Sequence, residues 1–266
     1  MWMRNIYSNL NQALQKFNSF GIGEQFDFQK LYLYSLVTHS TAIEGSTVTE
    51  VENTLMFDED IVPGGRTVTE QLMNLDLKRA YDFVARQVTE KPEITVDYLK
   101  KLSALVMRNT GSVYNTALGD FDSSAGDLRL VNVSAGRGGK TYPSYQKVPG
   151  KLEEFCSWLN EARRSTYEDE ASVYAFSFEA HYRLVSIHPW VDGNGRTCRL
   201  LMNMLQMERG LLPSILLKEH KAGYIEALAK SQDEEDSRIF VEFMMGEMTG
   251  FLWRSVEEFV KTSGIN

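Results

Sequence analysis

Residues 188–199 bring a base, a carboxylate, a glycine turn and two arginines into one short stretch. Residues 193–195 (Gly-Asn-Gly) can form a tight turn whose backbone approaches a ligand without Cβ atoms in the way. Residues 196–208 contain no Gly or Pro and have apolar side chains at helical spacing, so the turn should lie at a helix N-terminus. Such an end offers unpaired N–H groups and a partial positive charge to an anion. Arg196 and Arg199, on one face of that helix, would add two guanidinium groups suited to phosphate.

Two further side chains of this stretch suggest phosphorus chemistry rather than storage of an anion. His188 is a base that can take a proton from an attacking hydroxyl near neutral pH. Asp192 is a hard oxygen ligand suited to Mg²⁺ on a nucleotide. A lone His-Pro is usually only a turn, and a lone Gly-Asn-Gly is usually only a loop, but their conjunction is far more specific. The stretch therefore predicts a nucleotide site with its own base.

The stretch resembles the signature of the Fic (filamentation induced by cAMP) family, His-Pro-Phe-x-Asp/Glu-Gly-Asn-Gly-Arg-x-x-Arg. It matches at every fixed position except Trp190, an aromatic residue where Phe is usual. Trp190 should still be a buried anchor of the loop, provided that its N–H finds a partner. The resemblance implies a site that holds ATP with Mg²⁺ and moves AMP onto a protein hydroxyl. It implies His188 as the base, Asp192 as the magnesium ligand, and a phosphate cradle made by Gly193, Asn194, Gly195, Arg196 and Arg199.

A second recognisable feature lies far upstream, at Ser40-Thr-Ala-Ile-Glu44-Gly45. Ser40 and Glu44 would share one face at the end of a predicted helix, where the helix dipole disfavours a carboxylate. A solvated, frayed helix end would also explain an isolated Glu there. The stretch matches the Ser/Thr-x-x-x-Glu-Gly/Asn inhibitory motif of Fic proteins, in which the Glu pairs with the second signature arginine and blocks the γ-phosphate. The resemblance thus implies a Glu44–Arg199 pair, and the subclass whose inhibitory helix, at about residues 28–45, precedes the catalytic core.

One stretch ahead of the signature looks like β structure. Residues 127–134 alternate and are rich in β-branched side chains, residues 135–139 predict a turn, and residues 140–145 could return as an edge segment. A hairpin must lie on a larger body, where its open edge could pair with an extended segment of another protein. In Fic proteins a hairpin at this place, the flap, docks the target, which implies docking by Val133 and Tyr142. A surface hairpin without a partner is the alternative.

Tyr224 is a candidate for the adenine side of the pocket, because Lys221-Ala-Gly-Tyr224 resembles a segment that follows the signature in many Fic proteins. An ordinary core tyrosine is an equal alternative. None of the four histidines pairs with another at metal-ligand spacing, which argues against a zinc enzyme. Cys156 and Cys198 provide neither a disulfide framework nor metal spacing.

The composition describes an ordinary globular chain of 266 residues, 43% of them hydrophobic and 24% charged. The net charge is −8 and no block of Lys and Arg appears, which argues against nucleic acid or an anionic membrane as the main partner. The N-terminus lacks the apolar run of a signal peptide, so a cytoplasmic protein is expected.

The expected fold is mostly α: a Fic-like helical core with a small β-hairpin flap, preceded by N-terminal helices. Residues 1–92 are expected to form a helical region that carries the inhibitory helix. Residues 93–266 are expected to form the catalytic core with C-terminal helices. Between the inhibitory helix and residue 65 we expect a loop, followed by a capping box at Thr67 and Glu70. Helices are predicted at 6–17, 28–43 (with Asp27 as N-cap and Gly45 as stop), 67–88, 96–109, 148–164, 171–187, 196–208, 219–231 and 237–260.

The combined interpretation is a protein adenylyltransferase that moves AMP from Mg-ATP to a Ser, Thr or Tyr hydroxyl of a protein, which could be the chain itself, under inhibition by Glu44. Phosphoryl transfer is an alternative, but the Doc-like relatives that perform it have a lysine where this chain has Gly195. Removal of AMP at the same site and a nucleotide-sensing binding module are further alternatives. The sequence leaves open the target protein, the choice of nucleotide and whether the chain forms a homo-oligomer.

Overall fold

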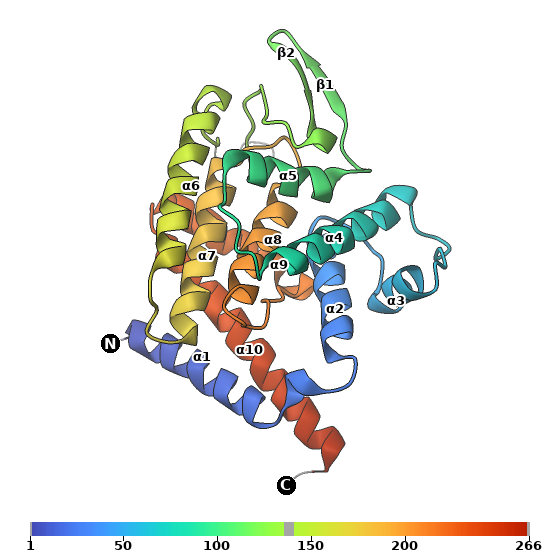
Figure 1. Ribbon diagram of the computed structural model, residues 1–266, viewed down its shortest axis with the longest axis vertical. Helices are drawn as coiled ribbons and strands as arrows, with labels where there is room; N and C mark the ends of the chain where they lie inside the picture. Colours follow the sequence, from blue (N-terminus) through green and yellow to red (C-terminus); the bar gives the residue numbers. More distant parts are fainter. Residues whose placement is uncertain (1, 136–140, 265–266) are drawn as a thin grey trace.

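The computed structural model of the chain describes residues 2–135 and 141–264. Within them the protein consists of ten α-helices, short 3-10 turns and one antiparallel hairpin (Figure 1). This confirms the predicted mostly helical fold, whereas the division of the chain at residue 92 stays a prediction. The helices are α1 (Trp2–Ser19), α2 (Phe28–Ile43), α3 (Glu50–Asp58), α4 (Val68–Gln87), α5 (Val96–Met107), α6 (Val148–Arg164), α7 (Glu170–Ile187), α8 (Asn194–Met207), α9 (Lys221–Asp233) and α10 (Ser237–Ser263).

Helix α8 lies at the centre of the molecule, and nearly all of its residues are buried. It packs against α7 and is also contacted by α2, α4 and α5 (Figure 1). A helix covered on all sides has little freedom to shift in a close-packed interior. The loop that joins α7 to α8, residues 188–193, is therefore held between two rigid helices, and the remaining signature residues lie in α8 itself.

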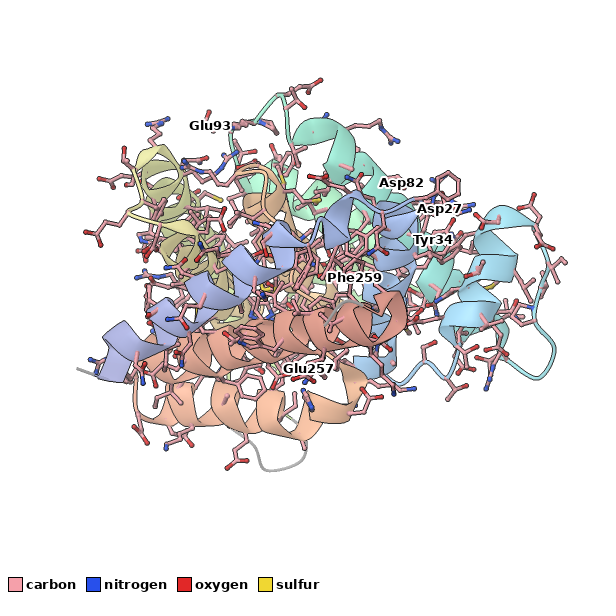
Figure 2. The ribbon with its side chains drawn as sticks, turned by 90° about the horizontal axis from the view of Figure 1, so that it is seen from below. Asp27, Tyr34, Asp82, Glu93, Glu257 and Phe259 are labelled. Carbon is pink, nitrogen blue, oxygen red and sulfur yellow. The ribbon has the colours of Figure 1, made fainter. Side chains whose placement is uncertain are left out.

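Helices α1 and α10 form an outer layer that packs on α7. The Phe259 ring of α10 lies 5.6 Å, centroid to centroid, from the Phe20 ring that follows α1 (Figure 2). Aromatic pairs at this distance add stabilisation beyond their buried area. None of the helices in the described part of the chain combines the length and apolar character that a membrane span requires.

The prediction of a loop between α2 and α4 is wrong, because this segment contains α3. This helix begins with a capping box in which Thr49 Oγ1 accepts from the Glu52 N–H at 3.3 Å and Glu52 Oε2 accepts from the Thr49 N–H at 2.8 Å. The capping signal was present in the sequence, but α3 is too short to show a clear apolar period. Asp27 occupies the predicted N-cap position of α2, but its side chain accepts no capping hydrogen bond and its φ is 60°.

The regular hairpin lies ahead of the predicted one. Strand β1 (Val113–Thr116) pairs antiparallel with β2 (Gly119–Asp122), and Figure 1 shows the two strands projecting from the top of the molecule. Only Phe121 of β2 is buried, and its ring stacks on Tyr114 across the pair at 5.0 Å. Each strand has only four residues, and one side chain anchors the pair. The sequence therefore shows no alternating apolar pattern here from which the hairpin could be predicted.

The strands predicted at 127–134 and 140–145 are wrong as regular strands. Among the described residues of this stretch, the two arms share one isolated bridge, between Ser134 and Thr141. The Tyr142 N–H also donates to the Val133 carbonyl at 3.2 Å. Most of the predicted turn, at 136–139, lies outside the described residues.

Arg129 links the bases of these two arms. The residue is 1% exposed, and its guanidinium donates to the carbonyls of Val131 at 2.8 Å and Pro143 at 2.6 Å. The arms are thus held at their base by this side chain in addition to the bridge between Ser134 and Thr141.

Candidate active site

His188 stands at the junction between α7 and the signature loop. Its backbone is left-handed (φ 52°, ψ 61°), and its N–H still donates to the Leu184 carbonyl at 3.2 Å. Pro189 prevents the helix from continuing, so the imidazole is presented at the end of α7. Burial lowers the pKa of His188 to about 4, which keeps the ring neutral near neutral pH. The predicted base is therefore in its basic form.

Trp190 and Asn194 close the signature loop. Trp190 is fully buried and its Nε1–H donates to the Gly126 carbonyl at 3.1 Å, which confirms the predicted anchor. Asn194 Oδ1 accepts from the Trp190 N–H at 3.1 Å and its Nδ2 donates to the Trp190 carbonyl at 2.9 Å. The Asn194 side chain thus holds the loop in this shape through the backbone of Trp190.

The N-terminus of α8 is open to an anion. Gly193 adopts φ 77°, and no side-chain oxygen in the described chain caps this helix. Asp192 lies beside it with 60% of its side chain exposed, and its Oδ1 accepts from the Gly193 N–H at 2.6 Å. No group of three or more His, Cys, Asp or Glu that could hold a metal occurs among the described residues. A lone exposed carboxylate beside a phosphate site still suits Mg²⁺, which commonly takes one or two carboxylates together with phosphates and water.

Arg196 carries an incompletely paired charge beside that helix end. Its side chain is 2% exposed, and its Nε and Nη1 are buried without a hydrogen-bond partner in the described chain. Its Nη2 lies 3.2 Å from Met107 Sδ and 3.7 Å from Asp192 Oδ1. A buried guanidinium with two unpaired nitrogens is costly unless an anion binds it. The arrangement fits a bound phosphate.

Arg199 is occupied by the end of α2. Its Nη2 donates to Glu44 Oε1 at 2.6 Å and to the Ser40 carbonyl at 3.0 Å, and its Nε donates to Ser40 Oγ at 2.9 Å. Burial by itself would raise the pKa of Glu44, but the charge and hydrogen bond of Arg199 hold that pKa below its usual value. Gly45 follows with φ 104° and ends the helix. The structure therefore brings Ser40 and Glu44 to the second signature arginine, while Gly45 ends the helix that carries them.

Gly195 lies in the narrow space between these groups. A Cβ atom placed there would be 2.5 Å from Glu44 Oε1 and 3.0 Å from Arg199 Nη1. Both distances are shorter than ordinary van der Waals contacts, so any side chain at this position must displace the carboxylate or the guanidinium. The absence of a side chain leaves the first turn of α8 accessible.

We expect Gly195→Lys to suppress nucleotide transfer in a Glu44→Gly background, where the Glu44 carboxylate no longer lies beside this glycine. The lysine would occupy the space beside the helix N-terminus and hinder the β-phosphate. Transfer of label from α-labelled ATP should fall by about tenfold or more, because a displaced β-phosphate would misalign the α-phosphate with the attacking hydroxyl. The matched control is Gly150→Lys, where an added Cβ meets nothing within 4 Å. Unchanged transfer by Gly195→Lys would contradict this account of the glycine.

Tyr224 lies behind Arg199 rather than on an open nucleotide pocket. It is 2% exposed, and its hydroxyl is 3.1 Å from His181 Nε2 and 3.5 Å from Arg199 Nη1. Its ring meets Phe240 at 5.8 Å in an edge-on arrangement. A nucleobase could not stack on this ring without rearrangement, so the structure favours the core alternative.

Arg129 and Tyr142 connect the base to the stretch predicted as the flap. Arg129 binds the carbonyls of Val131 and Pro143, and its Nε also donates to the His188 carbonyl at 2.7 Å. The Tyr142 ring stacks on the His188 imidazole with centroids 3.8 Å apart and an interplanar angle of 16°. Sequence reasoning selected Tyr142 but missed Arg129, because an arginine within an alternating stretch gives no sign that it will be buried.

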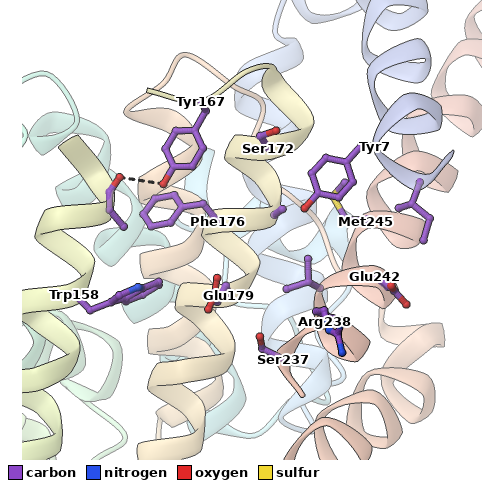
Figure 3. A pocket seen from close by; sticks show the side chains of 14 residues that line it. Tyr7, Trp158, Tyr167, Ser172, Phe176, Glu179, Ser237, Arg238, Glu242 and Met245 are labelled. Atoms are coloured by element: carbon purple, nitrogen blue, oxygen red, sulfur yellow. Dashed lines mark hydrogen bonds between the residues drawn. The ribbon is translucent and has the colours of Figure 1, made fainter. Parts of the chain in front are cut away.

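The described chain also contains a separate aromatic cavity of about 400 Å³, between α1, α6, α7 and α10 (Figure 3). Tyr7, Trp158, Tyr167 and Phe176 line it together with polar residues. It includes none of the residues that the sequence predicted for the site. The signature residues therefore form a site of their own, at the opposite end of α7.

The fold and the site together define a helical protein that can hold a polyanion beside a neutral base. Residues 93–206 match the Fic/DOC family. The chain belongs to this family, as the signature predicted.

Similar proteins and solved structures agree with this family assignment. The protein adenylyltransferase Fic of Drosophila willistoni is 30% identical over 217 residues, which are 82% of this chain and 39% of that protein. The chain thus spans about two fifths of the length of the curated relatives it matches. A fragment of Fic-1 from C. elegans is 25% identical with a TM-score of 0.75, covering 98% of this chain and 73% of that one. A Fic domain containing signaling protein from Bacteroides thetaiotaomicron, 18% identical with a TM-score of 0.76 over 94% of this chain and 96% of that one, shares the fold.

Proposed function

We propose that this chain is a protein adenylyltransferase that moves AMP from Mg-ATP to a Ser, Thr or Tyr hydroxyl of a protein. The observation that carries the proposal is that an uncapped helix N-terminus and the unpaired nitrogens of buried Arg196 follow within one short stretch of chain from the neutral imidazole of His188. Relatives named protein adenylyltransferase Fic support it.

In the proposed reaction, the target hydroxyl oxygen attacks the α-phosphorus of ATP. A new oxygen–phosphorus bond forms, the bond from the α-phosphorus to the bridging oxygen breaks, and pyrophosphate leaves. His188 takes the proton of the hydroxyl as the attack proceeds. Burial and the stacked Tyr142 ring fix the orientation of the imidazole, which is the requirement for a near-attack geometry.

The phosphates would be held by the first turn of α8 and by the two arginines. The N–H groups of Asn194 and Gly195 and the dipole of α8 suit the α- and β-phosphates, whereas the Gly193 N–H already donates to Asp192 Oδ1. Arg196 would supply its unpaired nitrogens, and Arg199 would bind the γ-phosphate once Glu44 has left it. Asp192 would hold Mg²⁺, which when bound neutralises charge on the phosphates.

The target would dock on the described parts of the two arms, residues 131–135 and 141–143. Arg129 binds the carbonyls of Val131 and Pro143 and the His188 carbonyl, which ties the base of each arm to the signature loop. Backbone groups of Val133 and its neighbours could pair with an extended target segment. Tyr142, which covers the imidazole face, would meet the residue that accepts AMP.

Glu44 would inhibit the enzyme by competing with the γ-phosphate for Arg199. One guanidinium cannot bind the carboxylate and the phosphate in the same geometry. The contacts of Arg199 with Ser40 and Glu44 support this competition.

The test of the proposed function is nucleotide transfer by Glu44→Gly. The variant and the wild-type protein are incubated with each of ATP, CTP, GTP and UTP, labelled at the α- or γ-phosphate, with and without host lysate. Modified proteins are then identified by mass spectrometry from the mass added. Transfer of label from the α-phosphate is expected. Label transferred only from the γ-position would instead indicate phosphoryl transfer.

The pH dependence of the reaction should reflect the lowered pKa of His188. The base acts as the neutral imidazole, so the rate falls only when the pH drops toward that pKa, about 4. In the Glu44→Gly background, the rate at about pH 5 should stay within about twofold of the rate at about pH 8. A histidine at the ordinary pKa of about 6.5 would lose about thirtyfold over this range. Initial rates, with folding checked by circular dichroism, distinguish the two cases.

A further inference from the structure

The C-terminal turn of α2 is held from two sides. On one side, Arg199 of α8 contacts Ser40 and Glu44. On the other side lies Asn74 of α4, which is fully buried. The hydrogen bonds that Asn74 makes within the described chain go to α2, α3, α4 and the segment that follows α2, not to α8. Asn74 therefore contacts the inhibitory turn without touching the signature loop.

The amide of Asn74 uses its full hydrogen-bonding capacity. Its Oδ1 accepts from Thr41 Oγ1 at 2.8 Å and from Asn53 Nδ2 at 2.9 Å. Its Nδ2 donates to Ser46 Oγ at 3.0 Å and to the Glu70 carbonyl at 2.8 Å. Asn53 Oδ1 is buried without a partner in the described chain, but both polar atoms of the Asn74 amide are fully bonded. Breaking any of the four bonds of this amide would leave a buried polar group unpaired, so the amide holds its partners firmly.

Two of these partners bracket Glu44 in the chain. Thr41 lies three residues before it and Ser46 two residues after it, and their side chains meet at the same amide. The Ser46 N–H also donates to the Thr41 carbonyl at 3.1 Å, which closes the turn. Thr41 and Ser46 are 0% and 6% exposed. The backbone position of Glu44 is thus fixed by hydrogen bonds on both sides of it, at Thr41 and Ser46.

We propose that Asn74 is a positioning residue for inhibition, whose amide holds the turn in the geometry from which Glu44 reaches Arg199. The inference rests on the proposed inhibition by Glu44 and names the residue that sets its strength. A carboxylate on a loose turn would have to lose conformational freedom each time it paired with Arg199. A turn already fixed by Asn74 removes that cost, so the inhibited state is preorganised.

The direct test is Asn74→Ala, which removes all four hydrogen bonds of the amide. Label incorporated from α-labelled ATP into the protein itself should rise by about three- to tenfold, less than in Glu44→Gly, because the carboxylate is loosened rather than removed. Thr41→Val is a milder variant that keeps the shape of the side chain and removes one bond to the amide. It should raise incorporation by about two- to threefold.

The same two substitutions should have no effect when Glu44 is absent. In a Glu44→Gly background there is no carboxylate to release, so Asn74→Ala and Thr41→Val should change the rate by less than about twofold. A residue that only supports the fold would lower activity in both backgrounds. An increase of equal size with and without Glu44 would overturn the proposal.

Asn160 of α6 provides a matched control. It also makes four hydrogen bonds: its Oδ1 accepts from the Ile94 N–H and Arg163 Nη1, and its Nδ2 donates to the carbonyls of Ile94 and Cys156. Asn160→Ala should therefore lower the melting temperature much as Asn74→Ala does. It should not raise incorporation, because it is not part of the α2 turn.

Hydrogen exchange provides a readout that does not depend on activity. Without nucleotide, a peptide covering residues 41–48 should exchange faster in Asn74→Ala and Thr41→Val than in wild type or Asn160→Ala. Unchanged exchange there would refute the positioning role even if the proposed inhibition holds. A Glu44→Gly variant no faster than wild type would refute the inhibition, while faster exchange in Asn74→Ala would still support the hold on the turn.

Discussion

Replacing Glu44 by glycine is expected to raise AMP transfer by about ten- to several-hundred-fold, including transfer to the protein itself. Glu44 Oε1 lies 2.6 Å from Arg199 Nη2 and so occupies the guanidinium that a γ-phosphate would need. A competing pair worth about 1.5–3.5 kcal/mol would change the competent population by this factor. The measurement is incorporation of label from α-labelled ATP by wild type and variant at equal concentration.

Stability should move in the opposite sense to activity. Arg199 keeps its two bonds to Ser40 but loses its carboxylate, so the variant should be less stable by about 1–2 kcal/mol in denaturant unfolding. Saturating Mg-ATP should restore part of this loss, because phosphate can replace the carboxylate.

Arg199→Ala supplies the control for this prediction. Added to Glu44→Gly, it should reverse the gain, because the group for which phosphate and carboxylate compete is no longer present. Glu50→Gly, at a carboxylate that instead pairs with Ser35 and His39, should leave transfer unchanged. A Glu44→Gly variant no faster than wild type would mean that Glu44 is an ordinary helix-end residue.

The second large effect is expected at His188. In the Glu44→Gly background, His188→Ala should lower AMP transfer by about 10²- to 10⁴-fold, the usual contribution of a general base. Affinity for Mg-ATP should change little, because the imidazole acts on the attacking hydroxyl and the phosphates are bound by α8 and the arginines. Initial rates and calorimetric titration with Mg-ATP measure the two quantities.

His220→Ala is the matched control, because His220 has a partly exposed side chain that pairs with Glu247, outside the signature loop. It should transfer AMP as its parent does. Transfer by His188→Ala at a rate near that of its parent would exclude the role of His188 as base. Loss of both transfer and Mg-ATP binding would show instead that the substitution disturbs the loop.

Local signals in the sequence were sufficient for the helices and for the composition of the site. Pro149 near the start of α6 and the capping box at Thr67 and Glu70 mark helix starts that the structure reproduces. The Gly-Asn-Gly turn and Arg199 predicted an anion site at the start of a helix, and the structure begins α8 at that turn, where a helix N-terminus favours anions. A short helix such as α3 shows too few apolar positions for its period to be recognised.

Contacts between distant residues depended on the tertiary structure. The resemblance implied that Glu44 pairs with Arg199, but only packing of α2 on α8 gives the 2.6 Å contact. The same is true of Asn74, whose four bonds join segments that no local pattern relates.

The sequence by itself determined which groups are available: a histidine after a helix, an uncapped helix end, two arginines and a distant carboxylate. These follow from local backbone preferences, which act over a few residues. The tertiary structure decided which groups are free and which are occupied. It tied the Asn194 side chain to Trp190, buried Tyr224 and made Arg129 the link between the base and the arms. Whether a polar side chain is free depends on which partners the fold brings to it, because a buried group must find one.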